Sequence, residues 1–114
     1  MSALPMNGLA AAVTALASLV ERFPDLPAAD ARISPIFPDL LVLSFYRNLG
    51  EFEAWRAALS ISATDVTLDG DADGNLLWLM AETAMGGTLV RLVGYGHKPQ
   101  DRAEVTDLVG AIAV

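Results

Sequence analysis

The segment from Leu40 to Tyr46 restricts the fold of this chain more than any other part of the sequence. Apart from Ser44, its residues are apolar on both faces of a strand, whose successive side chains point to opposite sides. A strand of this kind lies in the middle of a sheet that is covered by helices. The sequence therefore predicts an interior strand at residues 40–46 and helices packed on the sheet.

Four further segments have strand character. Ala31 to Ile36 is a weak strand, and Pro35 predicts a position at the edge of the sheet, because proline cannot donate to the hydrogen-bond ladder. Gly86 and Gly87 predict a hairpin turn, since glycine readily adopts positive φ. The other three strands are expected at residues 66–68, 76–83 and 88–95.

The first predicted helix covers residues 7–23. Its larger apolar side chains recur at spacings of four and three, which places them on one helical stripe. That stripe consists of Leu9, Val13, Leu16, Val20 and Phe23. The rest of the helix surface is mostly alanine with few charges, so we expect this helix to be packed on more than one side.

Two further helices are predicted. One begins after Asn48, which can cap its first turn with Glu51 in the capping-box position, and ends near Ser60. In this helix we expect Phe52, Trp55 and Leu59 to face the core and Glu51, Glu53 and Arg56 to face solvent. The other helix covers residues 102–112.

The complete predicted order is α-β-β-α-β-β-β-α in a single domain, residues 1–114. Runs of consecutive strands between helices favour an α+β fold with a mainly antiparallel sheet packed against the helices. The length of 114 residues is close to the common size of one domain.

The composition points to a covered apolar surface. Hydrophobic residues make up 54% of the chain and charged residues only 18%. This is more apolar surface than a monomer of this size usually hides. We therefore expect a second copy of the chain or a protein partner to cover part of it.

Charge and cysteine content exclude several functions. The chain has 14 acidic and 7 basic residues, a net charge of −7, and the basic residues are dispersed. Proteins that bind nucleic acid hold phosphates with clustered Lys and Arg, so the composition argues against a nucleic-acid partner. Because cysteine is absent, disulfides, thiolate metal ligands and a cysteine nucleophile are excluded.

The N-terminal part is apolar but does not have the pattern of a membrane or export segment. The uncharged stretch Gly8–Val20 is shorter than the roughly 20 residues that span a bilayer. Residues 1–9 contain none of the basic residues that begin a signal peptide. We expect a cytoplasmic protein that does not bind membranes.

A run of acidic residues is the sharpest local motif. Asp69, Asp71 and Asp73 alternate as ligands do in the first half of a calcium-binding loop, and Asn75 follows. The bidentate glutamate of such a loop is replaced by Met80. The alternative is a polar hairpin turn, in which Asp and Gly are favoured for backbone reasons. These four residues are therefore a candidate weak metal site, and no cofactor is expected.

His97 is the single histidine and lies at the end of the last predicted strand, followed by Lys98. The junction with the next helix could hold an anion on helix N–H groups. However, Pro99 breaks the glycine pattern of a dinucleotide-binding loop, and no nucleophile-elbow motif occurs. His97 is kept as a candidate ligand-binding residue, and no catalytic residue is predicted.

Four segments carry a resemblance to known proteins: Leu16–Leu19, Pro24–Ala29, Phe52–Leu59 and Leu92–Gly96. They are similar to parts of small uncharacterised proteins of actinobacterial type. The resemblance implies the order of the elements and a bacterial origin. It implies no activity, ligand or catalytic residue.

Three functions remain open on the sequence alone. The leading hypothesis is a non-catalytic protein-interaction domain that self-associates, for example as a dimer, through its first helix or an exposed sheet. The second is a small-molecule-binding module with an apolar pocket near Trp55, Trp78 and Tyr95, although both tryptophans lie in apolar patterns that are also typical of a core. The third is an enzyme that uses His97 with an unidentified carboxylate partner.

Overall fold

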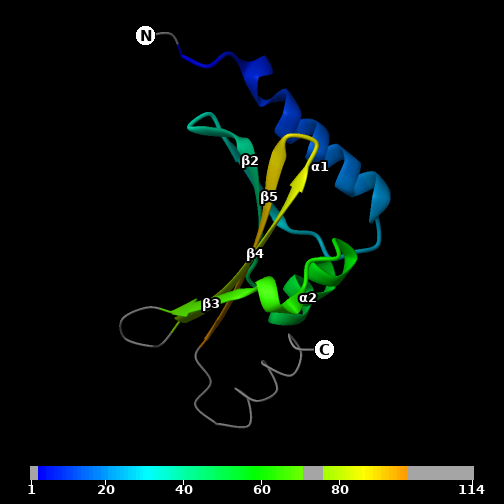
Figure 1. Cartoon of the computed structure of the whole chain (residues 1–114), viewed down its shortest axis with the longest axis vertical. Coiled ribbons are helices and arrows are strands. Elements are labelled where there is room, and N and C mark those ends of the chain that lie inside the picture. Colours follow the sequence, from blue (N-terminus) through cyan, green and yellow to red (C-terminus); the bar gives the residue numbers. More distant parts are fainter. Residues whose placement is uncertain (1–2, 71–75, 98–114) are drawn as a thin grey trace.

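The computed structural model describes residues 3–70 and 76–97, and these residues form an α+β arrangement, which confirms the predicted class (Figure 1). A 3-10 turn, η1 (Met6–Leu9), leads into α1 (Ala10–Arg22), β1 (Asp30–Ser34), β2 (Phe37–Phe45) and α2 (Leu49–Ala58). A second turn, η2 (Ala63–Asp65), precedes β3 (Thr67–Gly70), β4 (Leu76–Met85) and β5 (Thr88–His97). The predicted helix at residues 102–112 lies outside the described residues.

The strands form one five-stranded sheet in the order β1-β2-β5-β4-β3. β1 lies at an edge, as Pro35 predicts, and β2 is an interior strand, as its apolar pattern predicts. The pairs β1–β2, β3–β4 and β4–β5 are antiparallel, whereas β2 and β5 are parallel. The sheet is therefore mixed. The parallel pair differs from the antiparallel arrangement that we expected. Between β2 and β5 the chain passes through α2, β3 and β4, which return it to the end of the sheet where β2 begins, so β5 runs in the same direction as β2.

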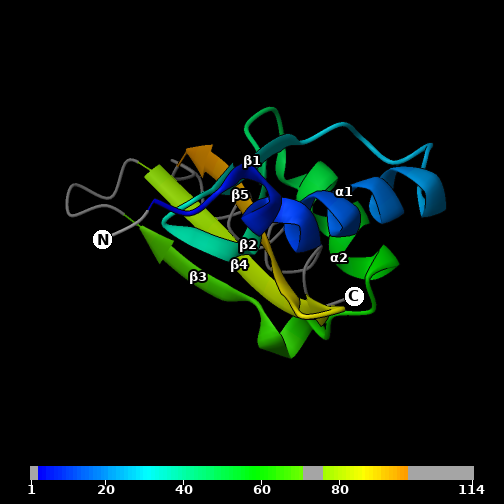
Figure 2. The same cartoon turned by 90° about the horizontal axis from the view of Figure 1, so that it is seen from above.

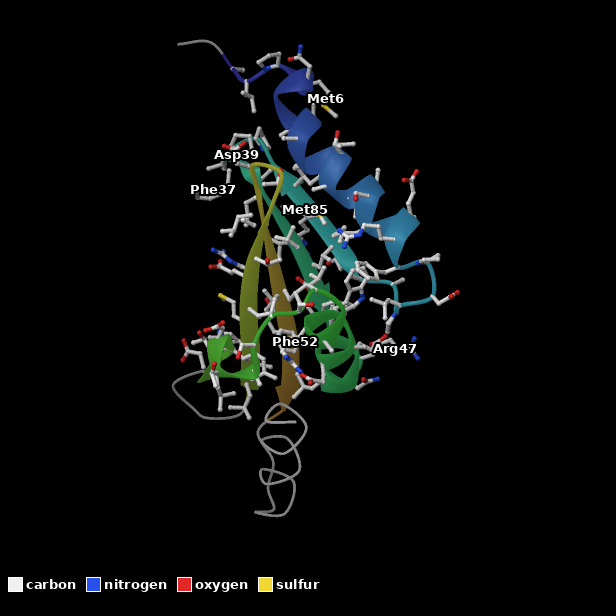
Figure 3. The ribbon with its side chains drawn as sticks, turned by 45° about the vertical axis from the view of Figure 1, so that its right-hand side comes forward. Met6, Phe37, Asp39, Arg47, Phe52 and Met85 are labelled. Atoms are coloured by element: carbon white, nitrogen blue, oxygen red, sulfur yellow. The ribbon has the colours of Figure 1, made fainter. Side chains whose placement is uncertain are left out.

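Both helices pack on the same face of the sheet, which we call the inner face (Figures 1 and 2). Alternate residues of the central strands point to this face and are buried, and Phe52 lies between α2 and the sheet (Figure 3). The buried strand residues of the core are Leu41, Leu43, Phe45, Leu79, Ala81, Val90 and Leu92. Helices among the described residues thus cover one face of β2, although its sequence is apolar on both.

The side of α1 that faces the core differs from the predicted stripe. Ala12, Ala15 and Leu19 are buried against the sheet, whereas Val13 is 50% exposed and Val20 is 61% exposed. The large side chains of β2 and β5 fill much of the space above the sheet, and the small side chains of Ala12 and Ala15 allow the helix backbone to approach it closely. Of the predicted apolar stripe, Leu16 and Phe23 pack half-buried against the core, whereas Val13 and Val20 lie on the outer surface of α1.

The start of α2 confirms the prediction, and one residue near its end contradicts it. Oδ1 of Asn48 accepts a hydrogen bond from the backbone N–H of Glu51 at 3.0 Å, which satisfies a free donor of the first turn. Phe52 and Trp55 are buried as expected, and Leu59 packs half-buried against the core. The expectation that Arg56 faces solvent is wrong. It is 8% exposed, because its guanidinium group donates to the Glu53 carboxylate and to the carbonyl oxygen of Ile61.

Glycines shape the sheet at the β4–β5 turn, as the sequence predicts, and also within β5. Gly86 and Gly87 connect β4 to β5 with φ of 54° and 84°, so the predicted hairpin turn is confirmed. In β5, Gly94 allows α2 to approach the sheet closely. A Cβ atom at Gly94 would lie 2.9 Å from Cβ of Phe52 and 3.0 Å from Cδ2 of Leu49. Any larger residue there would displace α2.

The chain reverses after α2 through a left-handed residue that is not glycine. Ser60 has φ of 58°, and its N–H donates to the carbonyl of Ala57 while the N–H of Ile61 donates to that of Arg56, each at 3.1 Å. This is the Schellman arrangement, in which glycine is favoured because it has no Cβ to clash.

Replacing Ser60 with glycine should therefore stabilise the protein. We expect the free energy of unfolding to rise by about 1 kcal/mol, since the steric cost of the left-handed conformation disappears. Urea unfolding followed by circular dichroism measures the change. An unchanged or lower unfolding free energy would contradict the strained geometry at Ser60.

Candidate functional site

The face of the sheet turned away from α1 and α2, here called the open face, carries paired apolar side chains. In the β4–β5 register Trp78 lies opposite Tyr95 and Met80 lies opposite Val93, and each pair shares one face of the sheet. No helix formed by residues 3–70 or 76–97 covers this face (Figure 2). A sheet face that contacts solvent normally carries polar residues. Val93 is buried, whereas Trp78, Met80 and Tyr95 are only half-buried, and these three side chains mark the open face as a candidate binding surface.

Two shallow hollows lie on the open face. The first has a volume of about 410 Å³ and is lined by Val42, Leu76, Trp78, Met80, Arg91, Val93 and Tyr95. Tyr46 extends it, since its ring stacks on that of Tyr95 with centroids 4.9 Å apart and planes 9° from parallel. The second hollow, of about 380 Å³, lies toward the β1–β2 turn and includes Ile36 and Phe37, which are 77% and 63% exposed. Figure 3 shows Phe37 projecting on the side of the sheet away from α1.

Two arginines of the open face are paired with carboxylates, and Asp69 of β3 lies opposite Trp78 on the same face. Arg91 lines both hollows, and its Nε donates to Oε2 of Glu82 at 2.5 Å. At the β1 edge, Nε of Arg32 donates to Oδ2 of Asp30 at 3.4 Å. Exposed ion pairs add little to stability. Their consequence here is that each of these arginines offsets one carboxylate on a chain whose net charge is −7.

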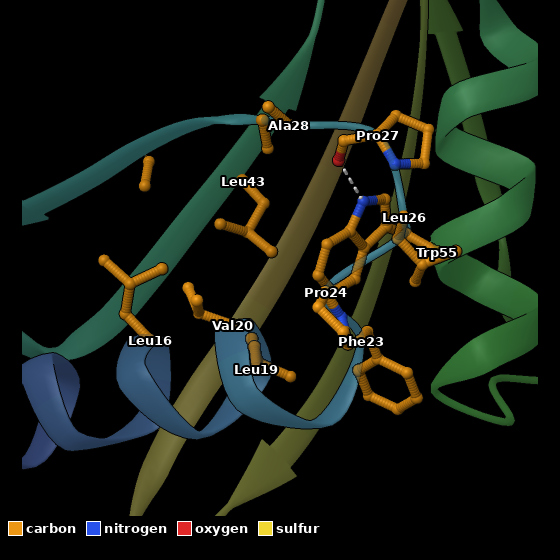
Figure 4. Close-up of a pocket in the computed structure, with 12 residues that line it drawn as sticks. Leu16, Leu19, Val20, Phe23, Pro24, Leu26, Pro27, Ala28, Leu43 and Trp55 are labelled. Carbon is orange, nitrogen blue, oxygen red and sulfur yellow. Dashed lines mark hydrogen bonds between the residues drawn. The ribbon is translucent and has the colours of Figure 1, made fainter.

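A separate cavity, here called the Trp55 pocket, lies on the inner side between the end of α1, the 23–29 connection and α2 (Figure 4). Its volume is about 260 Å³. Buried Leu19, Leu43 and Trp55 form its floor, and exposed Val20 and Ala28 border it. All of its lining residues are apolar.

Trp55 is held firmly in this position. Its Nε1–H donates to the carbonyl oxygen of Pro27 at 2.8 Å. Its ring meets that of Phe23 edge to face, with centroids 5.9 Å apart, and that of Phe45 at 6.4 Å. Aromatic contacts of this kind and the hydrogen bond fix the indole in one orientation. The wall of the pocket is therefore preformed.

The structure separates the three aromatic residues that the sequence placed near one pocket. Trp78 and Tyr95 lie together on the open face, whereas Trp55 lies on the inner side and lines the Trp55 pocket. Two-residue spacing within β4 and within β5 already indicates that Trp78 shares a face with Met80 and Tyr95 with Val93. The contribution of the 23–29 connection to a pocket was not predicted, because only the packing of α2 brings Pro27 to Trp55.

The remaining candidate residues are placed only in part. Asp69 lies in β3 opposite Trp78, and its Oδ1 accepts a hydrogen bond from the N–H of Gly70 at 2.8 Å. Asp71, Asp73 and Asn75 lie outside the described residues, as does Lys98. Across the described ranges, no three acidic or histidine side chains are grouped as metal ligands. The backbone of His97 ends β5 opposite Leu76.

The described residues form an α+β fold with helices on one side of a mixed sheet, an apolar open face on the other and an apolar pocket that opens to the surface. Among the described residues no helix has both the length and the apolar character needed to cross a membrane. No protein-family model, no curated protein and no solved structure matches this chain.

Proposed function

We propose that this protein is a non-catalytic interaction domain that forms a homodimer through its open face. The observation that carries the proposal is the row of paired apolar side chains, Trp78 with Tyr95 and Met80 with Val93, on a sheet face that no described helix covers. Burial of such a face against a second copy removes apolar area from water, which drives association. Two open faces related by a two-fold axis would stack like the layers of a sandwich.

The distribution of charge favours a second copy of the chain as the partner that binds the open face. A chain with a net charge of −7 repels its own copies over most of its surface. On the open face, however, Arg91 is paired with Glu82 and Arg32 with Asp30. These pairs lower the net charge of the open face, so two copies repel one another less there than over the rest of the surface. In a two-fold arrangement Arg91 of one copy can also pair with Glu82 of the other.

A charge placed on the open face tests this proposal. Replacing Met80 with lysine should raise the dimer dissociation constant by about 100-fold or more, because an unpaired ammonium group in an apolar interface costs about 3 kcal/mol or more. Sedimentation velocity over a range of concentrations measures the change. The matched control is Val13→Lys on the exposed side of α1, which should leave the dimer intact.

The results for the two variants distinguish the open face from the exposed side of α1 as the dimer contact. A wild-type chain that stays monomeric at every concentration contradicts the proposal. Dissociation by Val13→Lys and not by Met80→Lys would assign the contact to α1. Far-ultraviolet circular dichroism of both variants shows that the monomers remain folded.

The finer fold that we propose has the complete order α-β-β-α-β-β-β-α, with residues 102–112 as the last helix. Val105, Leu108, Val109 and Ile112 follow helical spacing and would give it one apolar stripe. Such a helix is the alternative to a second copy of the chain as the element that packs on the open face. Under our proposal Leu108→Lys leaves the dimer intact. A monomer that associates only after this substitution would assign the cover to the C-terminal helix instead.

A further inference from the structure

We infer that the Trp55 pocket binds small, uncharged ring compounds of one or two fused rings. This site lies on the inner side of the sheet and is independent of the dimer proposed above. The inference rests on the size of the pocket, the chemistry of its lining and the rigidity of its wall.

The size of the pocket suits a ring system and excludes a long chain. An apolar cavity of about 150 Å³ in another protein holds one benzene molecule. The Trp55 pocket, at about 260 Å³, has room for a somewhat larger ring. The atoms that line an unfilled apolar pocket lack the close contacts that packed atoms have. A ring that fills the pocket would restore these contacts.

The lining selects against charge. All residues around the pocket are apolar, and the carbonyl oxygen of Pro27 already accepts the Trp55 indole hydrogen bond. A charged group that entered would lose its hydration without finding a partner. The rings of Phe23 and Trp55 instead offer aromatic surfaces, against which another ring packs with favourable geometry. An uncharged aromatic compound therefore fits the lining better than an acid, an amine or a sugar.

The pocket is accessible and preformed. Exposed Val20 and Ala28 border it, so a ligand can enter without unfolding of the core. The indole of Trp55 is fixed by Pro27 and by the rings of Phe23 and Phe45. Because the wall is already ordered, binding does not have to immobilise it.

Two-dimensional ¹H–¹⁵N NMR of the full chain tests the inference, with unlabelled indole as the probe. The indole N–H groups of Trp55 and Trp78 give separate signals, and the two residues lie on opposite sides of the sheet. We expect the Trp55 signal to shift saturably, with a dissociation constant of about 1 mM or below for a ligand of this size. Indole-3-acetate, which carries a negative charge, should bind at least about tenfold more weakly.

A filling variant and its control complete the experiment. Ala31→Ile extends a side chain into the pocket from an exposed position of β1 and should weaken indole binding at least about tenfold, since the added methyl and methylene groups occupy the cavity. Ala84→Ile, at an exposed position of β4 on the open face, does not line the pocket and should leave binding unchanged. The inference is overturned if the Trp55 signal does not saturate, if Ala31→Ile binds indole as the wild type does, or if indole-3-acetate binds equally well. The oligomeric state measured in the same samples reports separately on the proposed dimer.

Discussion

Replacing Phe52 with alanine should lower the free energy of unfolding by about 3–5 kcal/mol, a large part of the stability of a domain of this size. Phe52 is fully buried between α2 and the sheet (Figure 3). A Cβ atom added to Gly94 would lie only 2.9 Å from Cβ of Phe52. Phe52 therefore packs directly on the backbone of β5. Gly94 has no side chain that could move into the space left by the ring. The cavity therefore persists in the variant, and the loss should lie in the upper part of the range.

Urea unfolding of Phe52→Ala, followed by far-ultraviolet circular dichroism, measures this loss. The matched control is Phe37→Ala, which removes the same side chain from a position that is 63% exposed. We expect the control to change the unfolding free energy by about 0.5 kcal/mol or less in the monomer. Equal losses in the two variants would contradict the assignment of Phe52 to the core. If Phe52→Ala does not fold at all, Phe52→Leu provides a milder loss at the same position.

Replacing Arg56 with methionine should cost about 2–3 kcal/mol of unfolding free energy. The guanidinium is buried and donates to both carboxylate oxygens of Glu53 and to the carbonyl of Ile61. The hydrogen bond to Glu53 raises the pKa of Arg56, so its charge is retained at every pH at which the fold is studied. Methionine keeps much of the volume but leaves the Glu53 carboxylate and the Ile61 carbonyl without their donor. The Glu53 side chain is 22% exposed, so water partly compensates and the cost stays below that of a fully buried pair.

A comparison with an exposed pair shows whether burial causes this effect. Arg32→Met removes the pair with Asp30, whose side chains are 71% and 41% exposed, and should change stability by about 0.5 kcal/mol or less. A double-mutant cycle with Glu53→Gln isolates the coupling between Arg56 and Glu53. A loss in Arg56→Met no larger than in Arg32→Met would show that the buried guanidinium does not stabilise the turn after α2.

The two proposed sites lie on opposite sides of the sheet and can fail independently. Met80→Lys alters the open face and leaves the Trp55 pocket unchanged, whereas Ala31→Ile fills the pocket from the inner side. Both proposals trace back to the apolar excess of the sequence. The structure divides that excess among a core, an uncovered sheet face and a cavity.

Local patterns in the sequence predicted most of the elements. Pro35 indicated the edge strand, Asn48 the start of α2, and Gly86-Gly87 the β4–β5 turn, and all three are confirmed. Each of these signals acts within a few residues, through a missing donor, a capping oxygen or an accessible φ. Such effects are present in the chain before any tertiary contact forms, so the sequence determines them by itself.

Other features depended on contacts between distant residues. The parallel pairing of β2 with β5, the burial of Arg56 and the alanine side of α1 against the core were not predicted. The two surfaces on which function is proposed were not predicted from the sequence either. Alternation along β4 and β5 indicates which residues share a face of the sheet, but it does not indicate which face the helices leave uncovered. The sequence alone determined which helices, strands and turns form among the described residues, because these depend on neighbouring residues, although β2 begins at Phe37 and α1 at Ala10, each three residues from the predicted start. Only the tertiary structure decided which apolar residues are covered, because that depends on the volume left when α1 and α2 pack on one side of the sheet.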